Sequence, residues 1–191
     1  MATYVLIYDG FAQFEIIFTC LFMKKKGDII AVGIDENEVK SIEGFIIKPA
    51  QQLKNIDIDE IDLLVIPGGE AKNIYNNSFL DELLIRLNEK KKVIAAICAA
   101  PVKLAKAGIL DDKKFTVDKP ELKEFKEYFK NSFFVNENVV IDENIITAKP
   151  CGYIDFALEI SKKMEIYKDD LQLQETVDFF KFYKDESGGE C

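Results

Sequence analysis

The amino-acid sequence predicts an α/β fold in which helices cover both faces of a mostly parallel central sheet. Short, continuously apolar runs alternate with segments of helical periodicity along the 191-residue chain, and this alternation is typical of parallel-sheet proteins. Hydrophobic residues make up 48% of the chain, which is enough to bury a continuous core. The chain has no internal repeat and no linker, so we predict a single domain over residues 1–184 and a polar tail over residues 185–191.

The first half of the chain predicts three strands, a hairpin and two helices. An apolar run at residues 4–8 ends at an Asp-Gly turn and predicts the first strand. Apolar residues then recur at helical spacing from Phe14 to Phe22, and three lysines followed by Gly27 end this helix with cations and a C-cap glycine. The pattern further predicts strands at 29–33 and 62–66, a hairpin at 39–48 and an amphipathic helix at 79–91.

The second half continues the alternation. Residues 93–97 form a continuous apolar run, as expected for a strand at the centre of a parallel sheet. After it we predict a helix at 101–107, a short strand at 114–117, a charged helix at 121–130, a hairpin at 139–148 and helices at 152–164 and 171–183. In such a sheet the ligand site lies beyond the carboxyl ends of the strands, which here carry residues 9–15, 67–70 and 98–100.

Composition narrows the partners and the chemistry. The net charge of −9 disfavours nucleic acid and anionic membranes as partners. The apolar run at the N-terminus is too short for a signal peptide or a membrane span, so we expect a cytoplasmic protein with reduced thiols. The four cysteines form no C-x-x-C pair and the chain has no histidine. We therefore expect no metal, no cofactor and no Cys–His or Ser–His catalytic pair.

The segment around Cys98 carries the sharpest functional signal. Cys98 follows the apolar run 93–97, and the small residues Ala96 and Ala100 stand two positions to either side, which is typical of a nucleophile elbow. Such a turn exposes the side chain above the sheet and directs the N-terminus of the next helix at the sulfur, which predicts a lowered thiol pKa. The alternative is a buried structural cysteine that ends a strand.

Two further segments supply candidate partners for Cys98. Gly68 and Gly69 directly follow a buried strand, and their N–H groups, with that of Ala99, are candidates for an oxyanion hole; a plain strand-ending turn is the alternative. Glu15 is expected in the first turn of the first helix, between two apolar residues. It either complements the helix dipole or is partly buried, in which case its pKa rises and the neutral acid can donate a hydrogen bond to a thiolate.

Four motifs, taken in order, make the chain resemble the ThiJ/PfpI family, also called the DJ-1 superfamily. They are Y-D-G-F-A-Q-F-E at 8–15, I-P-G-G at 66–69, A-A-I-C-A-A-P at 95–101 and T-A-K-P-C-G at 147–152, and the similarity spans about residues 3–165. The resemblance implies a flavodoxin-like three-layer sandwich related to class I glutamine amidotransferases, and a homodimer. It further implies that Cys98 is the reactive, oxidisable cysteine and Glu15 its hydrogen-bonding acid, with Gly69 and Ala99 as backbone donors.

One departure from the family concerns acid–base chemistry. Many members have a histidine shortly after the elbow helix, where this chain has Asp118 and Lys119. This argues against the protease and glyoxalase-type activities of the family, which are usually drawn with a histidine base. Asp118 is either an accessory base or a solvated loop residue. Cys151, next to Gly152, lies near the site by analogy and is either a resolving thiol for oxidised Cys98 or an unreactive loop cysteine.

Three functions are compatible with these residues. The first, which we favour, is a redox- or stress-responsive protein whose Cys98 is oxidised to a sulfinic acid by a small oxidant. The second is a hydrolase or lyase of the amidase, glyoxalase/deglycase or hydratase type, which uses Cys98 as its nucleophile without the usual histidine. The third is a non-catalytic module that binds a small molecule. The other two thiols, Cys20 in the predicted core and Cys191 in the tail, receive no role.

Overall fold

The computed structural model describes residues 1–184, and the predicted tail with Cys191 lies outside the described residues. Its central element is a seven-stranded sheet in the order β10-β11-β7-β6-β1-β2-β5. Adjacent strands run parallel except at the edge, where β10 is antiparallel to β11. The strands are β1 (Ala2–Ile7), β2 (Asp28–Gly33), β5 (Gln51–Gln52), β6 (Leu63–Ile66), β7 (Val93–Ile97), β10 (Val139–Asp142) and β11 (Ile145–Ala148).

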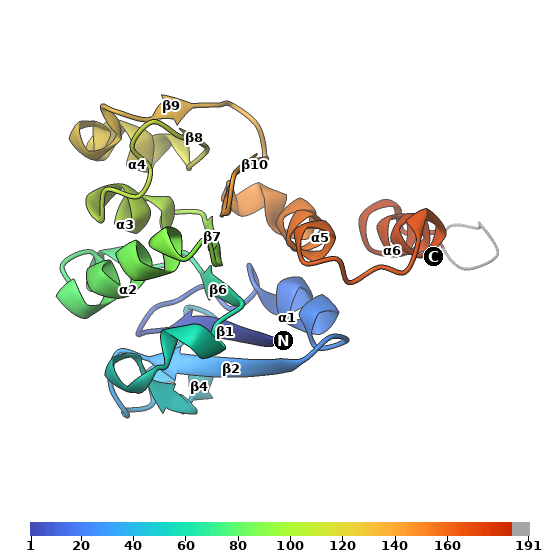
Figure 1. Cartoon of the computed structure of the whole chain (residues 1–191), viewed down its shortest axis with the longest axis horizontal. Helices are drawn as coiled ribbons and strands as arrows, with labels where there is room; N and C mark the ends of the chain where they lie inside the picture. The colour runs from blue at the N-terminus through green and yellow to red at the C-terminus, as the bar shows by residue number, and fades with distance from the viewer. Residues whose placement is uncertain (185–191) are drawn as a thin grey trace.

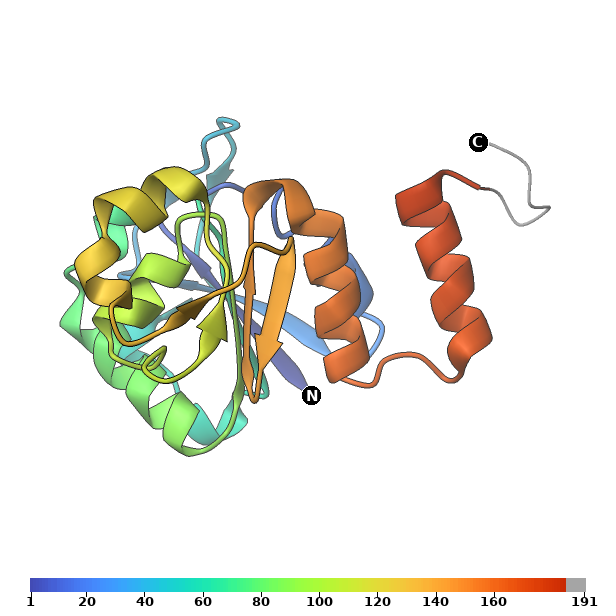
Figure 2. The ribbon, with the colours of Figure 1, turned by 90° about the horizontal axis from the view of Figure 1, so that it is seen from above.

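Helices cover both faces of this sheet, which gives three layers (Figure 1). On one face α1 (Ile17–Met23) packs beside α5 (Tyr153–Lys163), and on the other lie α2 (Ser78–Glu89) and α3 (Pro101–Lys106). Outside α5 lies α6 (Asp170–Phe182), which Figure 2 shows as the element farthest from the sheet. The ring of Phe180 on α6 packs edge-on against the ring of Phe22 on α1, with the ring centroids 4.9 Å apart. The predicted α/β fold, with a mostly parallel sheet covered on both faces, is therefore confirmed.

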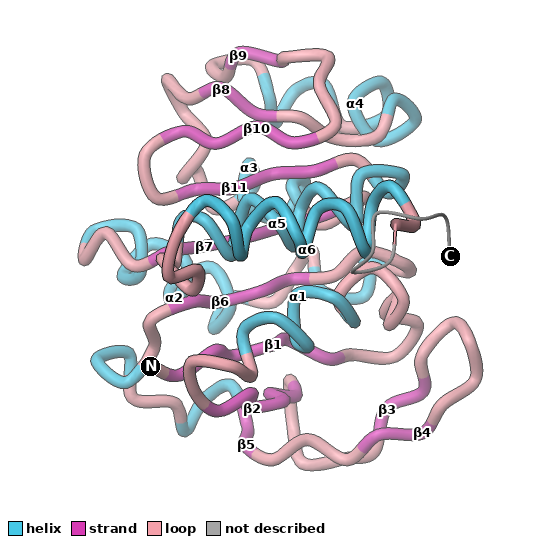
Figure 3. Tube along the Cα trace, turned by 90° about the vertical axis from the view of Figure 1, so that its right-hand side faces the viewer, coloured by secondary structure: helices cyan, strands magenta, loops and turns pink. Residues whose placement is uncertain are grey.

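The order of the strands decides where a site can form. From β1 the chain passes to β2 on one side of it and then to β6 on the other, so the order of the strands reverses between β1 and β6. In sheets of this kind ligands bind in the crevice beyond the carboxyl ends at that point. The strands β1, β6 and β7 lie side by side and end there (Figure 3). Their apolar side chains are almost entirely buried. This brings residues 9–15, 67–70 and 98–100 to one edge, as predicted.

Two small sheets and several single turns complete the fold. The predicted hairpin at 39–48 consists of β3 (Val39–Lys40) and β4 (Ile46–Ile47), and β8 (Lys114–Phe115) pairs in parallel with β9 (Phe133–Phe134). The 3₁₀ turns are η1 (Leu53–Asn55), η2 (Ile58–Glu60), η3 (Ala71–Ile74), η4 (Lys126–Phe129) and η5 (Pro150–Gly152).

Two helix predictions were wrong in their bounds. The helix predicted at 121–130 is divided, because α4 (Lys119–Glu124) ends at Phe125 and η4 follows. Aromatic packing accounts for the break: Phe125 packs edge-on against Tyr75 at 5.2 Å, and the ring of Phe129 stacks on Phe115 at 4.5 Å. The first helix begins at Ile17 rather than Phe14, and Glu15 lies in the turn that precedes it.

None of the helices among residues 1–184 is both long and apolar enough to cross a membrane.

Candidate functional site

Cys98 lies in a tight turn between β7 and α3. Its backbone adopts φ +64°, in the left-handed region that residues other than glycine rarely occupy. The turn is held from the neighbouring strand, because the Cys98 N–H donates to the carbonyl of Ala148 at 2.9 Å. The small side chains of Ala96 and Ala100 are fully buried on either side, whereas Cys98 itself is partly exposed. This is the geometry expected of a nucleophile elbow.

The loop after β6 approaches the cysteine so closely that it requires glycine. A Cβ on Gly68 would lie 2.8 Å from the sulfur of Cys98 and 2.9 Å from a carboxylate oxygen of Glu15. Gly69 has φ +90°, and a Cβ there would clash with the carbonyl of Gly10. The N–H groups of Gly69 and Ala99 lie near the sulfur of Cys98 and act to lower the pKa of the thiol. The role of these two amides as oxyanion donors stays a prediction.

The N–H group of Gly68, predicted as an oxyanion donor, has a different partner. Its N–H donates to Oε2 of Glu15 at 2.7 Å and is therefore already engaged. This bond, together with a hydrogen bond to the thiol of Cys98, holds the Glu15 carboxyl beside the sulfur. Glu15 is only 2% exposed although it precedes α1 in a turn. Of the two predicted roles for Glu15, partial burial and helix-dipole complementation, the structure supports burial.

Burial shifts the acid–base properties of Glu15. Loss of solvation raises the pKa of its carboxyl to about 7, against the opposing hydrogen bonds from Gly68 and Cys98. The negative charges of Glu43 and Asp118 raise the pKa of Glu15 further. A carboxyl with a pKa near neutrality can hold a proton or release one under physiological conditions, which is what acid–base chemistry at the sulfur requires.

The prediction of a lowered thiol pKa was wrong. Burial, and after it the charge and hydrogen bond of Glu15, raise the pKa of the Cys98 thiol to about 12. The amides of Gly69 and Ala99 act in the opposite direction but do not outweigh these effects. The helix that follows has only six residues, so its dipole is weak. At neutral pH the sulfur therefore keeps its proton, chiefly because it is buried and secondly because of the charge and hydrogen bond of Glu15.

Two tyrosines that sequence reasoning missed hold the loops of the site together. The hydroxyl of Tyr8 lies 2.8 Å from the carbonyl of Pro67 and 2.6 Å from that of Gly68. The hydroxyl of Tyr75 donates to the carbonyl of Ala99 at 3.0 Å. Tyr8 ends the first apolar run, so its position was visible in the sequence, but nothing in the sequence indicated the partner of Tyr75.

The three accessory residues occupy different environments. Asp118 is half-buried at the N-terminus of α4, accepts the N–H of Lys119 at 3.0 Å and is close enough for its charge to act on Glu15. Cys151 is exposed in η5, where its nearest polar partner is Oδ1 of Asn138 at 3.9 Å. Gly152 packs on the same asparagine, because a Cβ there would lie 2.9 Å from its carbonyl oxygen. Asp118 thus acts on the site through its charge on Glu15, whereas Cys151 and Gly152 contact Asn138 instead.

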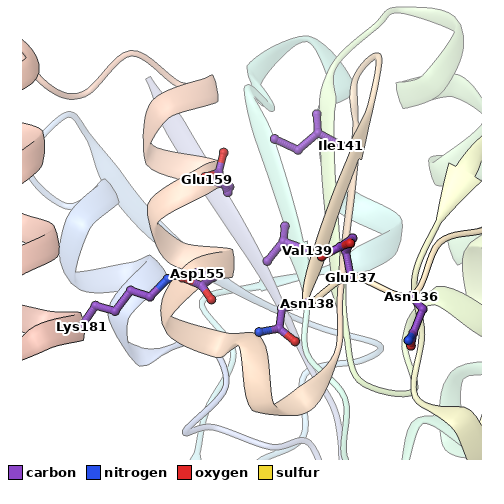
Figure 4. Close-up of a pocket in the computed structure, with 8 residues that line it drawn as sticks. All are labelled: Asn136, Glu137, Asn138, Val139, Ile141, Asp155, Glu159 and Lys181. Carbon is purple, nitrogen blue, oxygen red and sulfur yellow. Dashed lines mark hydrogen bonds and ion pairs between the residues drawn. The ribbon is translucent and has the colours of Figure 1, made fainter.

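A separate hollow of about 440 Å³ lies between β10, α5 and α6 (Figure 4). Lys181 of α6 points toward Asp155 of α5, and the two form an ion pair at 2.6 Å. The remaining lining residues are Asn136, Glu137, Asn138, Val139, Ile141 and Glu159. None of the residues that line this hollow was predicted as a site residue. Asn138 connects the hollow to the predicted residues, because it contacts Cys151 and Gly152.

No group of three or more His, Cys, Asp or Glu side chains among residues 1–184 is arranged to hold a metal ion.

Fold and site together define a class of protein: a flavodoxin-like α/β sandwich with a cysteine at a nucleophile elbow, hydrogen-bonded to a buried glutamate. The family model for the DJ-1/PfpI family matches residues 1–163. Protein DJ-1alpha of Drosophila melanogaster is 32% identical over 169 residues, which cover 84% of this chain and 76% of that protein. The chain belongs to the DJ-1/PfpI family.

A second relative and a solved structure extend this result. The glutathione-independent glyoxalase DJR-1.2 of Caenorhabditis elegans is 29% identical over 160 residues, covering 80% of this chain and 82% of that protein. The crystal structure of Drosophila melanogaster DJ-1beta superposes with a TM-score of 0.80 at 28% identity, covering 93% of this chain and 95% of that one. The flavodoxin-like architecture that the resemblance implied is thereby confirmed.

Proposed function

We propose that this protein responds to oxidants through Cys98, which peroxide converts to a sulfinic acid that the site retains. The observation that carries the proposal is the set of donors around the sulfur: the N–H groups of Gly69 and Ala99 and the Glu15 carboxyl. A sulfinate is an anion at neutral pH. The protonated form of Glu15, which its pKa of about 7 makes available, can donate to that anion together with the two amides.

The oxidation proceeds in two balanced steps. The ionised sulfur takes one oxygen atom from peroxide, and the other oxygen leaves as water, which gives a sulfenic acid; a second peroxide repeats the transfer and gives the sulfinic acid. Only the thiolate reacts at a useful rate. Because the pKa of Cys98 is raised, oxidation is slow at neutral pH and accelerates as the pH rises.

Intact mass after peroxide treatment tests the proposal. We expect the wild-type protein to gain two oxygen atoms at Cys98, and Cys98→Ser to gain none at that position. Exposed Cys151, assigned by peptide mapping, serves as the internal comparison. Progression of Cys98 to the sulfonic acid without accumulation of the sulfinic state, or no oxidation of Cys98 even at raised pH and after prolonged exposure to peroxide, would contradict the proposal.

A second candidate function is the conversion of small aldehydes. The observation that favours it is a carboxyl with a pKa of about 7 one hydrogen bond from the thiol. Glu15 can take the thiol proton as the sulfur adds to a carbonyl carbon, and return it to the oxygen, so that proton transfer needs no histidine. The name of the relative DJR-1.2 points in the same direction.

Turnover of methylglyoxal separates the two functions. For the oxidant-responsive protein we expect no consumption above that of Cys98→Ser, and weak or no hydrolysis of peptide substrates. Consumption that is lost in both Cys98→Ser and Glu15→Gln would establish the aldehyde chemistry instead. A site that neither turns over nor oxidises would leave a binding module, the third function considered above.

The homodimer and the cytoplasmic location remain predictions. Support for a dimer comes from large apolar side chains that stay exposed on and just before α1, namely Phe14, Ile17 and Leu21, at 44%, 44% and 49%. Light scattering of the wild type and of Leu21→Glu would test it, with a twofold difference in mass as the expected result.

A further inference from the structure

The hydroxyl of Tyr8 lies against two consecutive carbonyl groups of the loop that follows β6. The strands β1 and β6 are parallel, with Thr3 opposite Leu63. Continuing this register beyond the strands brings Tyr8 level with Gly68. The hydroxyl oxygen of Tyr8 is 2.8 Å from the carbonyl oxygen of Pro67 and 2.6 Å from that of Gly68. Two successive carbonyls therefore point toward the same hydroxyl.

The directions of these carbonyls fix the directions of two N–H groups. In a planar trans peptide the N–H of one residue points away from the carbonyl of the residue before it. The peptides of this loop are trans, so the N–H groups of Gly68 and Gly69 point away from Tyr8, to the other side of the loop. On that side the N–H of Gly68 donates to Oε2 of Glu15 at 2.7 Å.

The sulfur of Cys98 lies on the same side of the loop as Glu15. A Cβ on Gly68 would lie 2.8 Å from the sulfur and 2.9 Å from the Glu15 carboxyl, so both groups contact the same face of this residue. The neighbouring N–H of Gly69 acts to lower the pKa of the Cys98 thiol, which is the effect of an amide directed at the sulfur. The tyrosine and the cysteine thus contact the loop from opposite sides.

The peptide between Gly68 and Gly69 has a second orientation open to it. Gly69 has φ +90°, and glycine passes from this region to negative φ at little steric cost. Rotation of the peptide would turn the Gly68 carbonyl toward the sulfur in place of the Gly69 N–H. Two hydrogen bonds on that carbonyl oppose the rotation, from the Tyr8 hydroxyl at 2.6 Å and from the N–H of Ala12 at 3.0 Å.

The Tyr8 hydroxyl is a donor that does not change its state near neutral pH. Burial, and after it the charge of Glu15, raises the pKa of the Tyr8 hydroxyl well above its ordinary value. The side chain is 2% exposed, so bulk water does not reach the loop at this point. The hydroxyl therefore keeps its proton for the carbonyls of the loop.

We propose that Tyr8 is a positioning residue, whose hydroxyl holds the loop after β6 so that the N–H of Gly69 is directed at the sulfur of Cys98. The hydroxyl acts through the backbone and contacts the two carbonyls rather than the sulfur. The inference deepens the proposed function, because the same N–H would donate to a sulfinate, but it requires only that Cys98 can ionise.

Alkylation of Cys98 tests this role without peroxide. The thiolate displaces iodide from iodoacetamide, so below the thiol pKa the rate follows the ionised fraction. Tyr8→Phe keeps the ring and removes the hydroxyl. Between pH 8 and pH 9 we expect this variant to be alkylated at Cys98 about threefold more slowly than the wild type, which corresponds to a rise of about half a unit in the thiol pKa. Exposed Cys151, assigned by peptide mapping in the same sample, should keep its rate.

The direction of the change separates positioning from packing. Burial is the largest cause of the raised pKa of Cys98, so a variant that merely loosens the site would expose the sulfur and speed its alkylation. Tyr4→Phe is the matched control, because Tyr4 is fully buried on β1 and its hydroxyl donates to Oε2 of Glu60, before the start of β6, at 3.3 Å. This control should keep the wild-type rate at Cys98.

A second comparison separates the amide of Gly69 from the carboxyl of Glu15. The N–H of Gly68 bonds to Glu15, so the hydroxyl is removed again in a protein whose residue 15 cannot ionise. We expect Tyr8→Phe/Glu15→Gln to be alkylated about threefold more slowly than Glu15→Gln. Equal rates for these two variants would show that Tyr8 acts on the carboxyl, and would overturn the proposal.

The outcomes distinguish this proposal from the proposed function. Unchanged or faster alkylation of Cys98 in Tyr8→Phe overturns the positioning role, whatever peroxide does to the wild type. If the proposed function alone fails, wild-type Cys98 accumulates no sulfinic acid in peroxide, and Tyr8→Phe still slows alkylation.

Discussion

Two buried clusters of ionisable groups flank the Cys98 elbow. One pairs a cation with an anion, and the other pairs two acids. Lys103 on α3 has no exposed surface, and its ammonium group contacts Asp81 at 2.6 Å and the carbonyls of Tyr75 and Asn77 at 3.2 and 2.8 Å. Glu15, which is 2% exposed, has no cation as a partner among residues 1–184 and faces a thiol and backbone amides.

The difference explains why one cluster supports the fold and the other suits chemistry. Burial lowers the pKa of Lys103, whereas the hydrogen bond and the charge of Asp81 raise it. Lys103 also donates to the carbonyl of Tyr75, so this cluster connects α3 to the segment that carries Tyr75. In the other cluster both groups are acids, and burial raises the pKa of each. Opposite charges stabilise each other when buried, whereas two acids compete for protons, which makes the state of the site depend on pH.

The largest effect is expected from removal of Lys103. Lys103→Met leaves the carbonyls of Tyr75 and Asn77 and the carboxylate of Asp81 without their donor, so we expect the free energy of unfolding to fall by about 3–5 kcal/mol. Urea unfolding measures it. Lys106→Met, one turn later on α3, is the control and should cost less than about 1 kcal/mol. A similar loss for both variants would show that the buried pair has no special role in stability.

The second prediction concerns Glu15 and pH. Its pKa rises from 4.5 to about 7 on folding, so its contribution to stability is complete below pH 4.5 and is lost as the pH rises through 7. The loss amounts to about 3 kcal/mol by pH 9. Glu15→Gln cannot ionise, and its free energy of unfolding should exceed that of the wild type at pH 9 but not at pH 4. Exposed Glu89→Gln should follow the wild type, and parallel curves for wild type and Glu15→Gln would refute the raised pKa.

Neutralising the partner of the lysine is expected to have a smaller effect than removing the lysine. In Asp81→Asn the ammonium group keeps both carbonyl partners and an amide oxygen, so we expect a loss of about 2 kcal/mol, again by urea unfolding. The double variant Lys103→Met/Asp81→Asn should be less destabilised than the sum of the single ones, because the two side chains share one interaction. If the losses in the free energy of unfolding were strictly additive, the two side chains would not interact.

The smallest effect is expected in the reactivity of Cys98. The charge of Glu15 raises the pKa of the thiol, so Glu15→Gln should lower that pKa and increase alkylation by iodoacetamide at pH 8 by about tenfold. In the wild type we expect Cys98 to react more slowly than exposed Cys151. Slower alkylation in Glu15→Gln would mean that Glu15 assists the thiolate, as the sequence alone had suggested.

The sequence by itself determined the layered fold and the edge of the sheet at which the candidate site lies. Apolar runs such as 93–97 predict buried strands because burial on both faces leaves no place for polar residues. The small residues on either side of Cys98, and the glycines at 68 and 69, specify tight turns because only short side chains fit there. These are local requirements, and a local pattern suffices to reveal them.

Only the tertiary structure decided the acid–base state of the site. The pKa of Cys98 depends on its burial and on charges that the fold brings from Glu15, 83 positions away in the 191-residue chain. The engagement of Gly68 by Glu15, the burial of Lys103 and the break of the helix at Phe125 likewise depend on partners distant in sequence. Electrostatic and packing energies are sums over spatial neighbours, and one sequence does not contain the list of those neighbours until the chain has folded.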